Sequence, residues 1–191
     1  GIIVLTADSW RLSVILFPYL LILAILATIW HQVPEKSFDG HVNLMWISAH
    51  IVMSVGTYSL ITLAAVAALA ASIQERALKI KKRTRLSRIL PSVSISEGLI
   101  VRILIVSEII LVISLVTGMA VLYTTTGNFI EFNHKTTLTM SVFVIIGFML
   151  MIHFRSGIRG RAVTRIVLLA YLLLTLGYPG VKFITDVLLT S

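Results

Sequence analysis

The stretch Leu44–Ile73, LMWISAHIVMSVGTYSLITLAAVAALAASI, decides the fold of this chain. It contains no Asp, Glu, Lys or Arg, and it exceeds the roughly 20 apolar residues that an α-helix needs to cross a bilayer. Its one histidine, His50, lies about two turns inside the segment. An ionisable side chain at this depth is costly and usually marks a function or a cofactor. The stretch therefore predicts a membrane helix with His50 as the first candidate site residue.

The composition of the whole chain agrees with a membrane protein. Hydrophobic residues make up 58% and charged residues 13%, with a mean hydropathy of +1.01, against roughly 45–50% and about 25% in soluble domains. The apolar runs are continuous, which excludes the alternating pattern of an outer-membrane barrel. We predict an all-α fold, a polytopic transmembrane helical bundle, with residues 1–191 as a single domain. Its five membrane helices are expected at Leu12–Trp30, Leu44–Ile73, Leu99–Tyr123, Thr136–His153 and Ala162–Ile184.

Lysine and arginine are distributed unevenly between the two sides of these helices. Of the 16 basic residues, 13 fall on one side and three on the other. Because cytoplasmic loops carry such an excess, we expect loops 74–98 and 154–161 in the cytoplasm and loops 31–42 and 124–135 outside. The net charge of +8 then reflects topology and contact with the lipid bilayer. No nucleic-acid partner is expected.

Local patterns predict where the helices end. The helix over 44–73 should protrude into the cytoplasm until Pro91 stops any continuation. Ser96-Glu97 is the expected cap of the next helix. Pro179-Gly180 should kink the last helix near its outer end.

The alanines, the lack of cysteine and the N-terminal residues lead to three further expectations. Six alanines between positions 64 and 71 form a face suited to close helix packing. The chain has no cysteine, which excludes disulfides, thiolate metal sites, cysteine ligation of haem and a covalent c-type cytochrome. No cleavable signal peptide is visible, and the apolar start at Gly1 leads us to expect N-terminal sequence, including further helices, before it.

The histidines sort by their depth in the predicted bundle. His50 lies in the outer half of its helix, His134 lies at an outer helix edge, and His153 lies at the inner end of the same helix as His134. Neutral imidazole is a common axial ligand of haem, and His50 and His134 could converge over one outer pocket. Alternatives stay open: His50 as a core histidine hydrogen-bonded to Ser54 or Thr57, and the other two as interfacial residues without ligands.

Other chemistry has little basis in the sequence. There is no HExxH, P-loop or GxSxG pattern. Glu108 lies inside a predicted membrane helix, where a carboxylate is expected to be neutral or paired. A proton relay through Glu108 is an alternative, although no second acid accompanies it at membrane depth.

These residues resemble the cytochrome c assembly proteins of the CcsA/HemX type, and most closely their bacterial inner-membrane YpjD branch. His50 and Tyr58 match the family's His-x7-Tyr pattern, and Arg102 matches an arginine near the start of the following helix. His153 stands where the family has a membrane histidine. The similarity spans about Leu12–Leu189 and includes Thr117-Gly118, Gly157-Ile-Arg-Gly160-Arg161 and Tyr178-Pro179-Gly180.

The resemblance implies a protein that handles haem. It implies b-type haem on His50, with His134 as the nearest candidate for the opposite face of the iron, a second haem on His153 and a propionate held by Arg102. Arg102 could instead extend its charge to the membrane interface. The resemblance also implies a bacterial inner membrane, with the outer loops in the periplasm, and other cytochrome-assembly or respiratory membrane proteins as partners.

One departure from the family changes the expected activity. Haem lyases of this family carry a Trp-rich WWD loop, whereas residues 127–136 contain no tryptophan. Covalent haem attachment, and enzyme activity with it, is therefore not expected. A HemX-like or accessory role in cytochrome biogenesis or haem homeostasis fits better.

Two functions of other classes remain as alternatives. A non-haem accessory or scaffold subunit of a larger membrane complex would use the alanine-rich and apolar helix faces. A small transporter would need discontinuous helices near the membrane midplane, which are not evident in the sequence.

Overall fold

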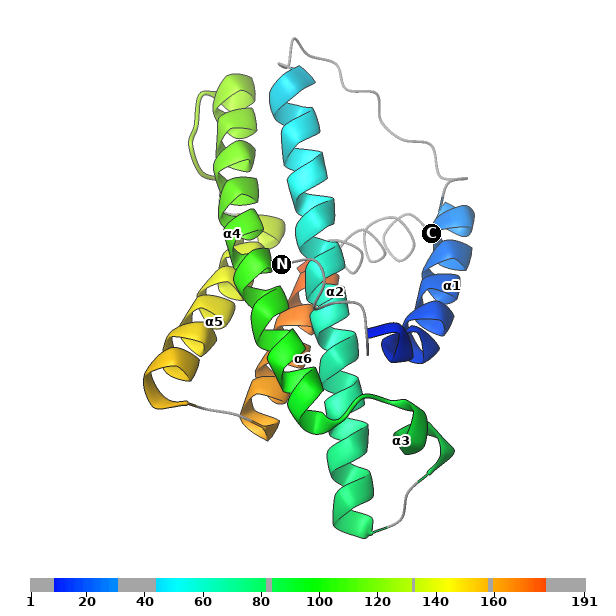
Figure 1. The fold of residues 1–191 in the computed structure, drawn as a ribbon. Coiled ribbons are helices and arrows are strands. Elements are labelled where there is room, and N and C mark those ends of the chain that lie inside the picture. Colours follow the sequence, from blue (N-terminus) through cyan, green and yellow to red (C-terminus); the bar gives the residue numbers. More distant parts are fainter. Residues whose placement is uncertain (1–8, 31–43, 82–83, 132, 158–159, 178–191) are drawn as a thin grey trace.

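The computed structural model describes residues 9–30, 44–81, 84–131, 133–157 and 160–177. These residues form helices and connecting turns, without a strand in the described ranges, which confirms the predicted all-α class (Figure 1). A short 3₁₀ helix, η2, opens the described chain. The elements are η2 (Ser9–Leu12), α1 (Ser13–Trp30), α2 (Leu44–Ile80), α3 (Arg85–Ile89), α4 (Val93–Thr126), α5 (His134–Ser156) and α6 (Arg161–Thr175).

Three of these helices, α2, α4 and α5, are long and apolar enough to cross a membrane. Helix α1 has 18 residues with a shorter apolar stretch, Ser13–Ile25, and α6 has 15 residues. The predicted spans Leu44–Ile73, Leu99–Tyr123 and Thr136–His153 are thus confirmed as helices of membrane length. Residues 178–184 of the last predicted span, including the expected kink at Pro179-Gly180, lie outside the described residues.

The inner ends of α2 and α4 differ from the prediction in detail. Helix α2 does protrude beyond its apolar part, but it ends at Ile80, because Lys81 adopts a left-handed backbone conformation (φ 53°). The predicted loop then contains the short helix α3, and Pro91 is buried between α3 and α4. The Ser92 side chain caps α4 by accepting from the backbone N–H of Ile95 (3.4 Å). The predicted cap at Ser96-Glu97 is wrong, because α4 begins directly after Pro91-Ser92 and buries Ser96 inside its first turns.

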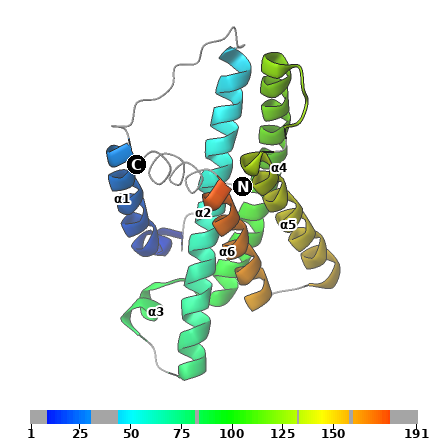
Figure 2. The same cartoon turned by 180° about the vertical axis from the view of Figure 1, so that it is seen from behind.

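The core of the molecule is the antiparallel pair α2 and α4, which make the most extensive contact. Helix α6 packs along the inner half of α2, and α5 packs against α4 and α6 (Figures 1 and 2). The predicted small-residue face of α2 is confirmed, because its alanines are at most 3% exposed and let the neighbouring backbones approach closely. These alanines are Ala64, Ala65, Ala67, Ala68, Ala70 and Ala71.

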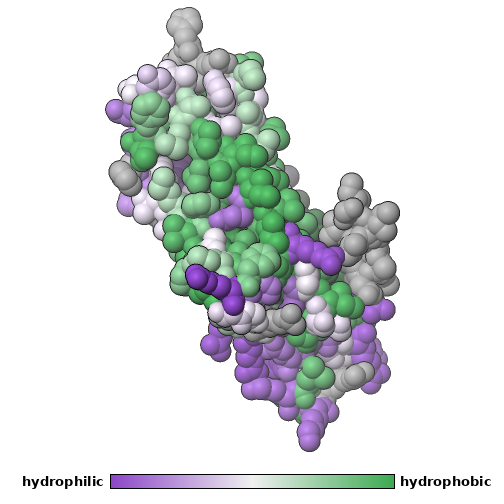
Figure 3. All heavy atoms as spheres, turned by 60° about the vertical axis from the view of Figure 1, so that its left-hand side comes forward, coloured by the Kyte–Doolittle hydropathy of each residue, from purple (hydrophilic) through white to green (hydrophobic). Residues whose placement is uncertain are grey.

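The alternating helix directions bring the basic segments together. The last turn of α2, the helix α3, the first turn of α4, the last turn of α5 and the first turn of α6 lie toward the same end of the molecule (Figures 1 and 2). We call this the basic end, and the opposite end, where α2 starts and α4 stops, the outer end. In Figure 3 hydrophobic side chains cover the middle of the visible face, and hydrophilic side chains gather at the basic end.

Candidate functional site: a histidine anchored between two membrane helices

His50, in the second turn of α2, turns its imidazole toward α4. Its Nδ1 atom lies 3.0 Å from the backbone carbonyl oxygen of Ser114. A carbonyl oxygen can only accept, so this contact requires a proton on Nδ1. The neutral ring then keeps its lone pair on Nε2, which is the atom available to a metal or to another donor.

Hydroxyl groups surround this anchor. The Ser54 and Ser114 side chains hydrogen-bond to each other at 2.9 Å, and the Thr117 hydroxyl donates to the same Ser114 carbonyl at 3.0 Å. The Ser54 hydroxyl also approaches Nε2 of His50, but at 3.5 Å, the long limit of a hydrogen bond. Nε2 is therefore the weakly engaged end of the ring, whereas Nδ1 is held firmly.

Gly118 makes this arrangement sterically possible. A Cβ atom at position 118 would lie 2.9 Å from Cε1 and 3.2 Å from Nδ1 of His50. Real Cβ contacts essentially never come this close, so any side chain at position 118 would push the imidazole away. Glycine is needed here because the imidazole approaches the α4 backbone closely. The backbone conformation does not require it, since the φ of Gly118 is not in the left-handed region.

The outer ends of α2 and α4 carry apolar side chains around this site. Helix α5 begins below their level in both ribbon views, so the upper parts of α2 and α4 stand as a pair within the described chain (Figures 1 and 2). The donor chemistry fits a haem iron, because the contact with the Ser114 carbonyl leaves the lone pair on Nε2. The exposed apolar residues here are Leu44, Met45, Trp46, Ile51, Val52, Val55 and Val116.

The interpretation of His50 as an ordinary core histidine predicted bonds to Ser54 or Thr57. The Ser54 contact exists at the long limit, whereas the Thr57 hydroxyl donates to the carbonyl of Met53 at 2.9 Å. The principal partner is instead the Ser114 carbonyl, 64 positions away. His50 is also half-buried rather than enclosed.

The structure does not bring the other two candidate histidines to His50. His134 is the exposed first residue of α5, and no hydrogen bond or ring contact joins it to His50 among the described residues. His153 lies 19 positions later in the last turn of α5, about 28 Å away along the helix axis. Its ring packs edge-on against Phe154, with 5.6 Å between the ring centroids. His134 and His153 therefore cannot bind one iron.

Arg102, the candidate for a haem propionate, lies on the exposed surface of α4 near the basic end. It precedes Ser114 by 12 positions, or about 18 Å along the helix axis. A propionate held by Arg102 would therefore belong to a group near the basic end, in the half of the molecule that contains His153.

Tyr58 belongs to a cluster of aromatic rings from three helices. The ring centroids of Tyr58 and Tyr171 lie 6.3 Å apart, and those of Tyr19 and Tyr171 are also 6.3 Å apart. The Tyr171 hydroxyl donates to the Tyr19 hydroxyl. Tyr58 thus connects α2 to α6 by packing, and it does not share a ligand position with His50.

Glu108 faces α5 at membrane depth. Both of its carboxylate oxygens are buried without a hydrogen-bond partner among the described residues. One of them lies 3.0 Å from the point where a Cβ would stand at Gly147. No second acid is placed beside it, and no group of three or more His, Cys, Asp or Glu residues in the described chain could hold a metal ion.

One residue of the His50 site carries no signal in the sequence alone. Ser114 contributes a backbone carbonyl, which every residue has, whereas Ser54 was expected as a neighbour of His50 on the same helix. Thr117-Gly118 did stand out as a small-residue pair at the end of a long apolar run. What connects it to His50 is the pairing of α2 with α4, which only the fold provides.

Comparisons with known proteins agree with this picture of the chain. The family model described as "Cytochrome C assembly protein" matches residues 3–189. A protein of Azospirillum brasilense, described as an uncharacterized 28.8 kDa protein in the nifR3-like 5′ region, is 53% identical over 185 residues, which cover 97% of this chain and 68% of the relative. No solved structure matches the chain.

Proposed function

Because the chain belongs to the cytochrome c assembly protein family, we propose that this membrane protein binds or hands over b-type haem during cytochrome biogenesis or haem homeostasis. Within the family we assign it to the CcsA/HemX type and the YpjD branch. We place it in a bacterial inner membrane, and its partners would be other cytochrome-assembly or respiratory membrane proteins.

The observation that carries this proposal is the fixed tautomer of His50. The Ser114 carbonyl oxygen lies 3.0 Å from Nδ1, and accepting the Nδ1 proton would orient the ring and leave Nε2 as the ligand atom. Haem and metal sites use the same arrangement, in which a second hydrogen bond fixes the ligating imidazole and raises its basicity. The haem would supply an iron that this nitrogen could ligate.

The residues around His50 would then have separate tasks. Gly118 leaves the space in which the imidazole lies, and Ser54, Ser114 and Thr117 hold the hydrogen-bond network that keeps it in place. His134 remains the candidate for a second ligand of the iron, which it would have to reach from the start of α5.

The direct test is haem titration of the full chain purified in a non-ionic detergent. We expect a Soret band typical of histidine-ligated b-type haem that saturates at a fixed stoichiometry. An absorbance that rises without saturation, as for haem dissolved in micelles alone, would contradict the proposal.

The sidedness of the basic end gives a second test. We propose that it lies in the cytoplasm, with the loop between α4 and α5 in the periplasm. Since the chain has no native cysteine, Asn128→Cys, at an exposed position, should react with a membrane-impermeant maleimide in intact cells. Arg85→Cys, on exposed α3, should react only after lysis. The reverse pattern would invert the topology.

His153→Ala tests whether the two ends of the bundle act independently. We expect this variant to keep the outer haem spectrum unchanged, because His153 lies at the basic end of α5, far from His50 at the outer end of α2. It should lose at most a second spectral species. If His153→Ala and His50→Ala lost the same species, the assignment of one ligand to each end would be wrong.

A non-haem scaffold function remains the second candidate. It is favoured by the apolar surface that α5 leaves exposed in the described chain, at Val144, Phe148, Met151 and Phe154. Under this alternative the purified chain would show no saturable Soret band. His50 would then act only as a hydrogen-bonded connection between α2 and α4.

A further inference from the structure

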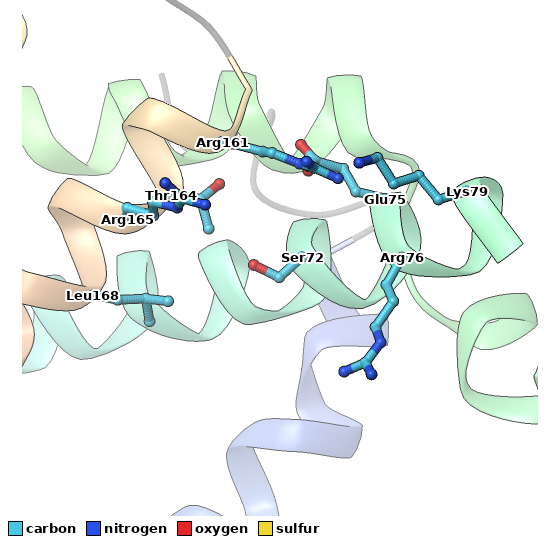
Figure 4. A pocket seen from close by; sticks show the side chains of 8 residues that line it. All are labelled: Ser72, Glu75, Arg76, Lys79, Arg161, Thr164, Arg165 and Leu168. Atoms are coloured by element: carbon cyan, nitrogen blue, oxygen red, sulfur yellow. The ribbon is translucent and has the colours of Figure 1, made fainter.

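A cavity of about 260 Å³ lies between α2 and α6 at the basic end, far along α2 from His50 (Figure 4). Four cationic side chains line it, two from each helix, together with one carboxylate, that of Glu75. The cations are Arg76, Lys79, Arg161 and Arg165.

The charges of this cavity do not balance. Glu75 pairs with Arg161, whose Nε atom lies 3.0 Å from Oε2. No described acid forms an ion pair with Lys79 or Arg165, so the lining keeps an excess of three positive charges. Glu97 of α4 also approaches this region, with Oε1 3.7 Å from a Cβ position at Gly160, and counting it still leaves an excess of two.

The cationic side chains of this cavity point in different directions. In Figure 4 Lys79 and Arg161 extend toward the Glu75 carboxylate, while Arg76 points away from them. Arg161 is half-exposed and Glu75 is 19% exposed, so the ion pair forms part of the wall. Thr164, whose hydroxyl donates to the Gly160 carbonyl, lines the same wall beside Arg165.

The surroundings of the cavity are apolar on the membrane side. Leu168 lines the cavity itself, and Leu172, one turn further along α6, is 53% exposed. On α2 the exposed Leu69 lies on the membrane side of the basic turns. A ligand in this cavity would therefore meet cations at its head and a hydrocarbon-like surface along its tail.

We propose that this cavity binds the phosphate of an anionic phospholipid headgroup, with the acyl chains lying along α2 and α6. Arginine and lysine suit phosphate oxygens, arginine through two parallel N–H bonds. Basic pockets between membrane helices at an interface are suited to acidic headgroups. The site would fix the inner halves of α2 and α6 to each other through a lipid, separately from the histidine at the outer end.

The test compares phosphatidylglycerol with phosphatidylcholine of the same acyl chains, added to the full purified chain and counted as bound lipids by native mass spectrometry. We expect a clear preference for phosphatidylglycerol. The double variant Lys79→Gln/Arg165→Gln should reduce this affinity about 25-fold, at roughly fivefold for each cation removed near a lipid surface. The single variants should each lose roughly fivefold, which keeps the proposal testable if the double variant folds poorly.

The matched control is Arg85→Gln/Arg88→Gln on α3. It removes the same charge from exposed positions at the same end of the molecule and should leave the lipid preference unchanged. An equal loss in both double variants, or an unchanged preference in Lys79→Gln/Arg165→Gln, would overturn the proposal. Inorganic phosphate provides the last arm: binding as tight as that of phosphatidylglycerol would assign the cavity to free phosphate and overturn the lipid assignment.

Discussion

His50→Ala is expected to lower haem affinity by more than about 100-fold, because loss of an outer-shell partner alone typically costs about 10–100-fold and this change removes the ligand itself. The Soret band of the purified chain should disappear or shift to that of unligated haem. The measurement is haem titration by absorbance, with circular dichroism to verify that the helices remain.

A second variant separates ligation from packing. In His50→Asn the side-chain amide can still donate to the Ser114 carbonyl, so the connection between α2 and α4 survives while the imidazole nitrogen is lost. If His50 only stabilises the fold, replacing it with Ala should cost about 1–3 kcal/mol, and neither variant should change haem binding.

Tyr58→Phe is the matched control for the same helix. Tyr58 lies eight positions from His50, about 12 Å along the axis, and contributes its ring to the aromatic cluster rather than to the His50 site. The substitution removes one hydroxyl group and should leave haem affinity near that of the natural chain. Wild-type affinity and spectrum in His50→Ala would reject ligation by His50 and favour the scaffold function.

Gly118→Ala is expected to lower haem affinity by about 10–100-fold while the protein stays folded. The new Cβ would lie 2.9 Å from Cε1 of His50. The imidazole is the movable end of a side chain, so it can rotate away without displacing the backbone. The imidazole then loses its hydrogen bond to the Ser114 carbonyl and the orientation that makes Nε2 a ligand.

The stability of this variant should change little, which distinguishes a positioning role from a structural one. The lost hydrogen bond costs about 0.5–1.5 kcal/mol. Replacing a helical glycine with alanine regains about 0.5–1 kcal/mol. The two contributions nearly cancel, so thermal unfolding should stay close to that of the natural chain while haem titration does not.

Gly98→Ala, on the same helix α4, is the control. A Cβ at position 98 would meet nothing within 4 Å. It should raise stability by about 0.5–1 kcal/mol and leave haem affinity unchanged. A double-mutant cycle completes the test. In the His50→Ala background, Gly118→Ala should have no further effect on haem binding, and an effect that persisted there would show that Gly118 acts independently of His50.

The sequence by itself determined the three helices of membrane length and which helix ends lie together. Apolar runs of membrane length predicted α2, α4 and α5, and the uneven lysines and arginines predicted which helix ends share a side, because hydropathy and charge are local properties that each segment carries with it. The alanine-rich face of α2 was predictable for the same reason. The cap of α4 was misplaced because Ser96-Glu97 has the residue types of a cap, and only the path of the backbone after Pro91 selects Ser92.

Only the tertiary structure decided what the marked residues contact. His50 was visible as a costly polar group, but its partner is the backbone carbonyl of Ser114, 64 positions away, and Gly118 leaves the room for it. Likewise, in the sequence Lys79 and Arg165 indicated only topology. The packing of α6 beside α2 places them around one cavity. Hydropathy shows that a helix lies in the membrane, but it does not fix which face meets which neighbour. That choice depends on how side chains of different helices fit together, and from it come the distances on which a site depends.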